Sequence, residues 1–420
     1  REDAIELFYA LQSQLDASGA PDKSQALIKD LIKEWIKENE ERQRTGQITQ
    51  TTLRGKTTAM EGAISIYLLK HLRLKTVGQI QQDTFMGYRT WRVTEGWKHL
   101  TSSWGKVVPK DSTVKRDLVH AKDWFANFLI PKGYTAVVPT MEKITIRQDQ
   151  LDANPPIPLE PDWRSIHLHL KQWASDGLKH PNPRVSYWRE CFRHFVLVSY
   201  QAGTRPLELL GEVEKVRKIA ADGSASVEKK IRSGLRWEDV EIDMATHVND
   251  VSGKEFQKSV ATLYVRESKT GVPREVPCNA GDFLIRWRKY CDNYRKEQGL
   301  RPLNKSDYVF FNPYTDQPYS YTHFYRTWDE MRERLKDELS PVRSNQKYTI
   351  YSLRSSYITN QIEEGKDIYL IKKITGHSLE LLHRHYDRSD VRKRSAEAVQ
   401  RTYAKTKKRP NAIDLENLEP

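Results

Sequence analysis

A cluster of prolines divides this chain of 420 residues into two parts. Residues 154–161 read Asn-Pro-Pro-Ile-Pro-Leu-Glu-Pro, so four of eight positions are proline. Proline lacks a backbone N–H and clashes with the preceding helical turn, so no helix is expected to continue through this segment. A proline-rich stretch acts as a semi-rigid spacer. We therefore predict a linker at 154–161, and a length of about 150 residues per domain fits two or three domains in all.

The part before the prolines is predicted to be helical. Ile28, Leu31 and Trp35 recur at helical spacing, a second apolar series begins near Thr57, and a third follows a capped start at Asp111. We divide this part into an N-terminal extension of unknown role, 1–55, and a helical domain, 56–153. Basic residues of this part, among them Arg89, Arg92, Lys115 and Arg116, are available to face a phosphate backbone. For any one of them, a solvated helix face is the more frequent alternative.

The charge of the chain favours a polyanionic partner. Sixty-nine Lys and Arg against 56 Asp and Glu leave a formal charge of +13 (69 − 56), which concerns partners and solubility rather than fold. The three cysteines show no Cys-x-x-Cys spacing, which excludes a disulfide scaffold and a cysteine zinc ribbon. No apolar stretch approaches the roughly 20 residues that a membrane span needs. We expect a soluble, intracellular protein.

The part after the prolines combines helices with a β-hairpin. Apolar patterns predict helices at 163–173, 187–200, 283–294, 321–335, 353–363 and 368–375. Residues 260–267 and 274–277 are rich in β-forming residues, and the short spacing between them predicts a hairpin with Lys269 at its tip. Residues 211–234 are charged and lack apolar periodicity, so we predict a surface excursion there. A folded domain over 162–404 and a tail over 405–420 complete the expected organisation.

Three short motifs are spread over this second part. The first is Gly203-Thr204-Arg205-Pro206-Leu207-Glu208, the second is Tyr351-Ser352-Leu353-Arg354, and the third is Gly376-His377-Ser378 with Tyr386 nine residues after the histidine. Arg205 and Arg354 are 149 residues apart, and His377 follows Arg354 by 23. Each motif alone is common in unrelated proteins. Their order and separations, together with the hairpin lysine, resemble the tyrosine recombinases, also called the phage integrase family.

The resemblance covers about residues 160 to 403 and extends more loosely over 56 to 150, whereas 1–55 match nothing. It implies a mainly α-helical protein with a small β-sheet and hairpin. The 56–153 segment would be a helical core-type DNA-binding domain, and 162–404 a mixed α+β catalytic domain. Together, the two domains are expected to form a clamp around DNA.

The resemblance also implies a role for each motif residue. Cutting a phosphodiester without hydrolysis needs a nucleophile, a cationic cradle for the phosphate, and an acid for the leaving oxygen. Tyr386 would be the nucleophile, leaving a 3′-phosphotyrosine, and Lys269 the general acid. Arg205 and Arg354 carry planar donor forks that match two phosphate oxygens. His377 would hydrogen-bond the phosphate.

Two features depart from the family pattern. Tyr351 stands where the family usually keeps a histidine, so it joins the candidate catalytic residues while the identity of the general base stays open. The 211–234 stretch interrupts a region that usually runs directly into the Leu-Arg-Trp-Glu-Asp pattern at 235–239. Glu208 is expected to orient Arg205 rather than to touch the substrate.

The family further implies the partners. We expect double-stranded DNA with inverted-repeat core sites, a homotetramer on two duplexes, accessory DNA-bending proteins, and no cofactor, metal or membrane. The basic segment 392–409 is the candidate for docking on a neighbouring protomer. The protein would be a site-specific recombinase, an integrase of a phage or other mobile element, in the cytoplasm and on the nucleoid of a prokaryotic host.

Other interpretations remain possible from the residues alone. The same chemistry serves telomere resolvases and relaxing topoisomerases. Residues 353–375 could be a helix-turn-helix of a non-catalytic regulator, although this explains neither Lys269 nor Tyr386. A metal site at His377, His383 and His385 is disfavoured, because residues two apart on a helix lie on different faces.

Overall fold

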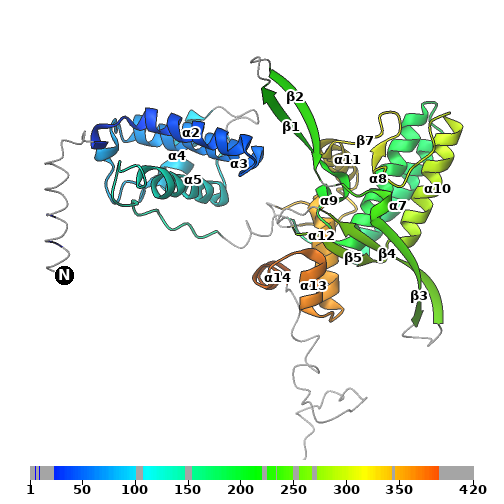
Figure 1. The fold of residues 1–420 in the computed structure, drawn as a ribbon. Helices are drawn as coiled ribbons and strands as arrows, with labels where there is room; N and C mark the ends of the chain where they lie inside the picture. Colours follow the sequence, from blue (N-terminus) through cyan, green and yellow to red (C-terminus); the bar gives the residue numbers. More distant parts are fainter. Residues whose placement is uncertain are drawn as a thin grey trace, which may run out of the picture. The chain divides into compact units, whose positions relative to one another are not determined.

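The computed structural model describes Ile5, Tyr9 and residues 23–100, 107–146, 154–219, 225–232, 234–248, 255–266, 272–342 and 346–386. The chain divides into two compact units, residues 1–151 and 152–420, and each is described by itself. The predicted fold class, mainly helical with a small β-sheet and hairpin, is confirmed (Figure 1). None of the helices in the described ranges is long and apolar enough to cross a bilayer.

The first unit consists of helices packed around an aromatic core. Its α-helices are α2 (Ile28–Arg44), α3 (Gln50–Thr57), α4 (Tyr88–Thr94) and α5 (Asp111–Trp124). Wider π-helical turns at Thr58–Ile64 and Tyr67–His71 extend α3, and one at Phe125–Leu129 extends α5. Tyr67 lies at the centre, with its ring centroid 5.0 Å from those of Tyr88 and Trp91.

Helix α2 belongs to this same core, which corrects the predicted division at residue 55. Ile28, Leu31 and Trp35 are buried in one cluster with Met60 and Trp124. An amphipathic helix must cover its apolar face, and the helix that begins at Gln50 covers this one. The described residues before 56 are therefore part of the helical unit rather than a separate extension.

The second unit is built around one buried helix. Helix α8 (Pro183–Ala202) begins with Asn182 as its cap, whose side chain accepts the Arg184 N–H at 3.0 Å, and with proline in its first turn. Thirteen of its residues are buried. The helices packed with it in the same core are α7 (Arg164–Leu178), α10 (Gly281–Glu297), α11 (Tyr321–Arg334) and α12 (Ile350–Glu363).

Three antiparallel sheets complete the described part of the unit. Strands β3 (Val240–Val248), β4 (Glu255–Val265) and β5 (Arg274–Cys278) form one sheet in that order. The predicted β4–β5 hairpin is present, with Val265 opposite Arg274. Its tip, including Lys269, lies outside the described residues. Strand β3 was not predicted, and β6 (Phe311–Asn312) and β7 (Gln317–Pro318) form a minor pair.

The charged stretch at 211–234, predicted as a surface excursion, has regular secondary structure in its described residues. Its described residues form β1 (Glu212–Ile219) and β2 (Ala225–Arg232), an antiparallel hairpin in register from Glu212 opposite Arg232 to Ile219 opposite Ala225 (Figure 1). The strands are joined by backbone hydrogen bonds, which charged side chains do not prevent. Apolar periodicity was therefore the wrong criterion for this segment.

The proline-rich segment is packed against the second unit. Ile157 is buried in its core, and the Ile157 N–H donates to Ser356 Oγ at 2.8 Å. Thr349 Oγ1 donates to Asn154 Oδ1 at 2.6 Å. No α-helix runs through the described part of the segment, although Pro161 lies in the wide helical turn Leu159–Trp163 that precedes α7. From Asn154 onward the segment is anchored rather than a free spacer.

Candidate active site

The first motif forms the turn that follows the buried helix α8. Gly203 has a φ of 59°, the left-handed conformation that ends helices and that glycine adopts without strain. Arg205 then stands at the start of the short helix α9 (Pro206–Leu210). Its side chain is 18% exposed. The rigid end of α8 thus fixes the position of the Arg205 backbone.

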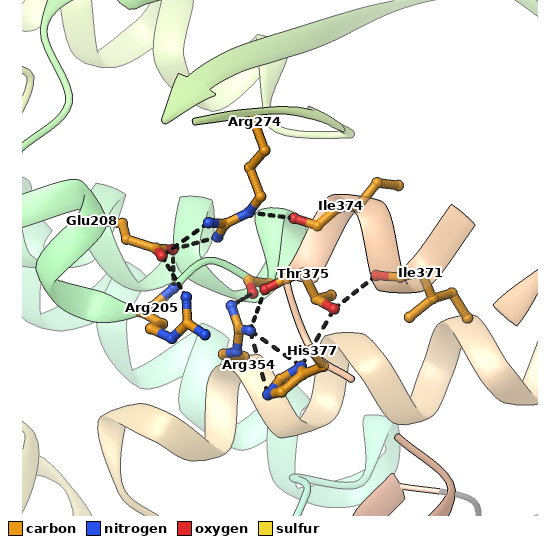
Figure 2. Close-up of polar contacts among 9 residues, drawn as sticks. Arg205, Glu208, Arg274, Arg354, Ile371, Ile374, Thr375 and His377 are labelled. Carbon is orange, nitrogen blue, oxygen red and sulfur yellow. Dashed lines mark hydrogen bonds and ion pairs between the residues drawn. The ribbon is translucent and has the colours of Figure 1, made fainter. Parts of the chain in front are cut away.

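Glu208 holds Arg205 from one turn further along α9. Its side-chain oxygens accept two hydrogen bonds from Arg205, at 2.8 Å from Nη1 and at 2.8 Å from the backbone N–H. The same carboxylate accepts Nη1 of Arg274 at 3.0 Å and Nη2 at 2.5 Å (Figure 2). Arg274 is the first residue of β5, so the carboxylate joins that strand to α9.

The second and third motifs meet at Arg354. This residue lies in the first half of α12 and is 3% exposed. Its Nη1 donates to the Gly203 carbonyl at 2.7 Å, and its Nη2 donates to the Thr375 carbonyl at 2.5 Å. Nη2 also lies 3.2 Å from Nδ1 of His377 (Figure 2). Arg354 therefore joins the turn after α8 to the end of α13 (Ile368–Thr375).

His377 is placed by the turn that ends α13. Gly376 has a φ of 67°, a second left-handed glycine, and it reverses the chain between α13 and α14 (Leu379–Tyr386). Thr375 Oγ1 lies 3.3 Å from His377 Nδ1 and donates to the Ile371 carbonyl at 2.7 Å. The imidazole is half-buried. Segments more than 170 residues apart thus bring Arg205, Arg354 and His377 together.

The cluster carries excess positive charge. Burial of Glu208 acts to raise its pKa, but the hydrogen bonds and charge of Arg274, the Arg205 N–H and the charge of Arg354 outweigh burial, so its pKa is lowered. Glu208 is therefore ionised at neutral pH. Three guanidinium groups and one carboxylate leave an excess of two positive charges (3 − 1). A phosphodiester is an anion that such planar donor groups match.

Of the remaining candidates of the second unit, two lie in described helices and one lies outside the described residues. Tyr351 is half-buried, one turn before Arg354 on α12. Tyr386 is the last residue of α14, one turn beyond the fully buried Leu382, which fixes that helix in the core of the unit. Lys269 lies outside the described residues, between the paired ends of β4 and β5. Within the described ranges, no group of three His, Cys, Asp or Glu side chains could hold a metal ion.

The DNA-binding candidates of the first unit fall into two groups. Lys115 and Arg116 are exposed on α5, and Arg89 is partly exposed while its Nε donates to Asp111 at 2.7 Å. Arg92 is buried, and its Nε lies 3.1 Å from Asp117 inside the unit. Its charge is used within the fold, so the prediction that Arg92 faces DNA is corrected.

Sequence reasoning missed Arg274. The residue belongs to a predicted strand, and nothing in its sequence neighbourhood marks it as part of a site. Its partner Glu208 is 66 residues away, and its third hydrogen bond, from Nε to the Ile374 carbonyl at 2.7 Å, spans 100 residues. The one available signal was chemical. A carboxylate in a basic motif needs cationic partners when it is buried.

The turn at Gly203 should tolerate no side chain. A Cβ built there would lie 2.1 Å from Cδ1 of the buried Tyr357, on a left-handed backbone. Gly203→Ala should therefore lose about 1–3 kcal/mol to backbone strain and a similar amount, about 1–3 kcal/mol, to overpacking, measured by denaturant unfolding. Gly365→Ala is the matched control, because Gly365 has a φ of 73° and nothing within 4 Å of its Cβ position. Equal losses in the two variants would contradict the packing of Tyr357 on this turn.

The chain is similar to a known protein family and to several solved structures. Residues 233–393 match the model of the phage integrase family. A lambda integrase dimer bound to a COC′ core site matches over 93% of this chain and 89% of its own, with 14% identity and a TM-score of 0.53. A Tn1549 transposon integrase in complex with a circular intermediate DNA matches over 89% and 98%, with 15% identity and a TM-score of 0.53.

A third solved structure, XerH site-specific recombinase bound to a difH substrate, matches over 83% of this chain and 78% of its own, with 14% identity and a TM-score of 0.50. At such identities the likeness concerns the fold. The comparison with curated proteins found no matching relative.

Proposed function

We propose that this chain, which carries a domain of the phage integrase family over residues 233–393, is a site-specific DNA recombinase that cuts and rejoins DNA through a 3′-phosphotyrosine. Its biological reaction would be the integration or excision of a phage or other mobile element. The observation that carries the proposal is the meeting of Arg205, Arg354 and His377 at one position, from three separate segments.

In the proposed reaction, a tyrosine, three phosphate-binding side chains and a lysine have separate roles. Tyr386 Oη gives its phenolic proton to solvent and attacks the phosphorus in line with the 5′ oxygen, and the P–O5′ bond breaks as the P–O(Tyr) bond forms. Arg205, Arg354 and His377 stabilise the charge on the non-bridging oxygens. Lys269, from the hairpin tip, gives its proton to the departing 5′ oxygen. A 5′ hydroxyl from a second strand then reverses these steps without any external energy source.

Other tyrosines fit the nucleophile less well. Burial raises the pKa of Tyr357 to about 12, with a smaller contribution from the charge of Glu364, although the charge of Arg354 lowers it, so its phenol is hard to ionise. The ring of Tyr357 also packs on Gly203. Tyr369 is 60% exposed on α13 and has no motif contact in the described residues. Tyr386 has the spacing from His377, nine residues, that the sequence motif predicts for the nucleophile. It lies in a helix that contacts α12 and α13.

The partner proposed for this chain is duplex DNA with inverted-repeat core sites, bound by both units and recombined by four protomers. Several of the similar structures hold DNA, and the charge of +13 suits this partner. A non-catalytic helix-turn-helix regulator would not need Arg205, 149 residues away, beside Arg354 and His377. A telomere resolvase would share the chemistry and would differ in its product, a closed hairpin end.

The experiment that tests the function is the trapping of the intermediate. A nicked suicide duplex carrying the recombination site loses its short 5′-hydroxyl fragment after cleavage, so the covalent complex cannot be religated. In the presence of EDTA we expect an SDS-resistant adduct on the 3′-phosphate end of the cut strand. The absence of any adduct on a site that the protein binds would contradict the proposal, and hairpin products would identify a resolvase.

DNA affinity should depend steeply on salt. Each neutralised phosphate contributes about −0.9 to the slope of log K against log salt concentration. Two units that contact several phosphates each should therefore give a slope steeper than about −3. Replacing the exposed Lys115 and Arg116 by Ala should make the slope shallower by about 2. Fluorescence anisotropy at several salt concentrations measures this, and a wild-type slope shallower than about −3 would contradict binding by two units.

A further inference from the structure

We infer that Arg274 is a positioning residue of the proposed recombinase, which holds Arg205 and the His377 turn in their working arrangement and anchors the start of β5. The inference rests on the proposed function and adds a residue to it. Arg274 belongs to none of the three motifs. It would act through other groups, so it is not a catalytic residue.

The Arg274 guanidinium is held by three hydrogen bonds. Three of its nitrogens are used: Nη1 and Nη2 form a fork on Glu208, at 3.0 and 2.5 Å, and Nε donates to the Ile374 carbonyl at 2.7 Å (Figure 2). The Arg274 and Glu208 side chains are 8% and 4% exposed. A buried bidentate pair of this kind fixes orientation as well as charge. Lysine could supply the charge but not the fork.

Arg274 controls Arg205 through the shared carboxylate. Oε1 of Glu208 accepts from Nη1 of both arginines, and Oε2 accepts from Arg274 Nη2 and from the Arg205 N–H. The carboxylate therefore cannot rotate without breaking bonds to both residues. If Arg274 were removed, Glu208 would lose two of these four bonds. Arg205 would then be held by a carboxylate whose own position is no longer fixed.

The same guanidinium reaches the segment that carries His377. The Ile374 carbonyl lies in the last turn of α13, three residues before the histidine. A Cβ built on Gly376 would lie 3.6 Å from Nη1 of Arg274, so the guanidinium packs directly against this turn. Because Arg354 holds Thr375 from the other side, the turn is fixed between two arginines.

Arg274 also anchors one limb of the β4–β5 hairpin. It is the first residue of β5 and pairs with Val265, the last residue of β4. Lys269 precedes it by five residues. The described strand that follows the proposed acid in the sequence is therefore attached, through one side chain, to the elements that carry Arg205 and His377.

Removing Arg274 should also change the pH dependence of cleavage. The charged groups that face Glu208 are Arg205 on α9, Arg274 on β5 and Arg354 on α12. With Arg274 absent, burial of Glu208 is less well opposed, and its pKa should rise toward the neutral range. A protonated Glu208 holds Arg205 less well. Cleavage by the variant should therefore fall more steeply than wild-type cleavage as the pH is lowered.

The test is single-turnover cleavage of the suicide duplex at saturating DNA, by the full-length protein. Arg274→Met should cut about 10–100-fold more slowly than wild type, the range expected for misplaced reacting groups, with DNA affinity nearly unchanged. Its extra loss of rate at low pH should disappear in the double variant Arg274→Met, Glu208→Gln. Arg274→Lys keeps the charge, so it should show an intermediate rate and no added pH dependence.

Arg266→Met provides the matched control. Arg266 follows β4 on the opposite limb of the same hairpin and forms ion pairs with Glu238 at 2.8 Å and Asp239 at 2.5 Å, away from the cluster. It should cut at close to the wild-type rate. An Arg274→Met variant as fast as Arg266→Met would overturn the inference. If Arg274→Met does not fold, a wild-type rate for Arg274→Lys would overturn it equally.

Different results would contradict the proposed function and the positioning role of Arg274. If wild type forms no covalent adduct on a bound site, the proposed function is wrong. If wild type forms the adduct and Arg274 variants cut normally, only the positioning role is wrong. A loss of DNA binding in Arg274→Met, with cleavage unchanged at saturating DNA, would also contradict the positioning role.

Discussion

Tyr386→Phe should eliminate the covalent protein–DNA adduct while leaving folding and DNA binding intact. The substitution removes one oxygen and keeps the aromatic ring, so the packing of α14 through Leu382 is preserved. Without the phenolic oxygen no phosphotyrosine bond can form, so the expected loss is complete rather than partial. The measurement is denaturing electrophoresis of protein incubated with the labelled suicide duplex, alongside binding by anisotropy.

Two controls make this result specific. Tyr369→Phe, at an exposed position of α13, should form the adduct at the wild-type rate. Tyr357→Phe removes a hydroxyl from a buried ring that packs on Gly203, and it should keep most of the activity. An adduct formed by Tyr386→Phe would show that another residue is the nucleophile.

Loss of either motif arginine should reduce cleavage by at least about a hundredfold, the effect typical of removing one stabiliser of transition-state charge. Binding should change little, because most affinity comes from other phosphate contacts. Arg205→Ala is the simpler variant, since the described partner of that side chain is Glu208. Arg354→Ala also leaves the Gly203 and Thr375 carbonyls without a donor, so it should lose stability as well.

The two effects of the Arg354 substitution can be separated. Denaturant unfolding reports the loss of stability, and single-turnover cleavage at a temperature where the variant is folded reports the loss of chemistry. Arg288→Ala, on α10 and paired with Asp292 at 3.3 Å outside the site, is the control. If Arg205→Ala or Arg354→Ala cuts as fast as Arg288→Ala, that arginine does not contact the phosphate.

Three residues of the candidate site could be singled out from the sequence because they come in short motifs at the ends or the start of helices. Gly203 and Gly376 mark the ends of α8 and α13, and the residues after them, Arg205 and His377, are placed by those turns. Arg354 lies one turn inside a helix whose start is capped by Thr349. Helix ends and caps of this kind can be predicted from the sequence. In the structure, Arg205, Arg354 and His377 lie at such positions and come together.

Contacts between distant segments were not readable in the same way. Arg274 has its partners 66 and 100 residues away, and Arg92 looked like a surface cation although Asp117 holds it inside the first unit. Whether a charged side chain faces solvent or a buried partner depends on tertiary packing. A basic residue in a helical pattern therefore remains ambiguous until its neighbours are known.

The β1–β2 hairpin and α2 illustrate two further limits. The hairpin at 212–232 has many charged residues and little apolar alternation, so its strands could not be predicted from the apolar pattern. Helix α2 was predicted as a helix but assigned to a separate extension, because no motif linked it to the rest. Its apolar face contributes Leu31 and Trp35 to the core of the first unit, a fact that follows only from packing. The division of the second unit at residue 404 stays a prediction.

The most direct test of the account is to identify the residue that carries the DNA. Wild-type protein should be trapped on the metal-free suicide duplex, digested with trypsin and nuclease, and analysed by mass spectrometry for a peptide bearing a nucleotide through its 3′ phosphate. We expect a single modified residue, Tyr386. Modification of another tyrosine, such as Tyr351 or Tyr403, or a DNA-bound protein that never becomes modified, would contradict it.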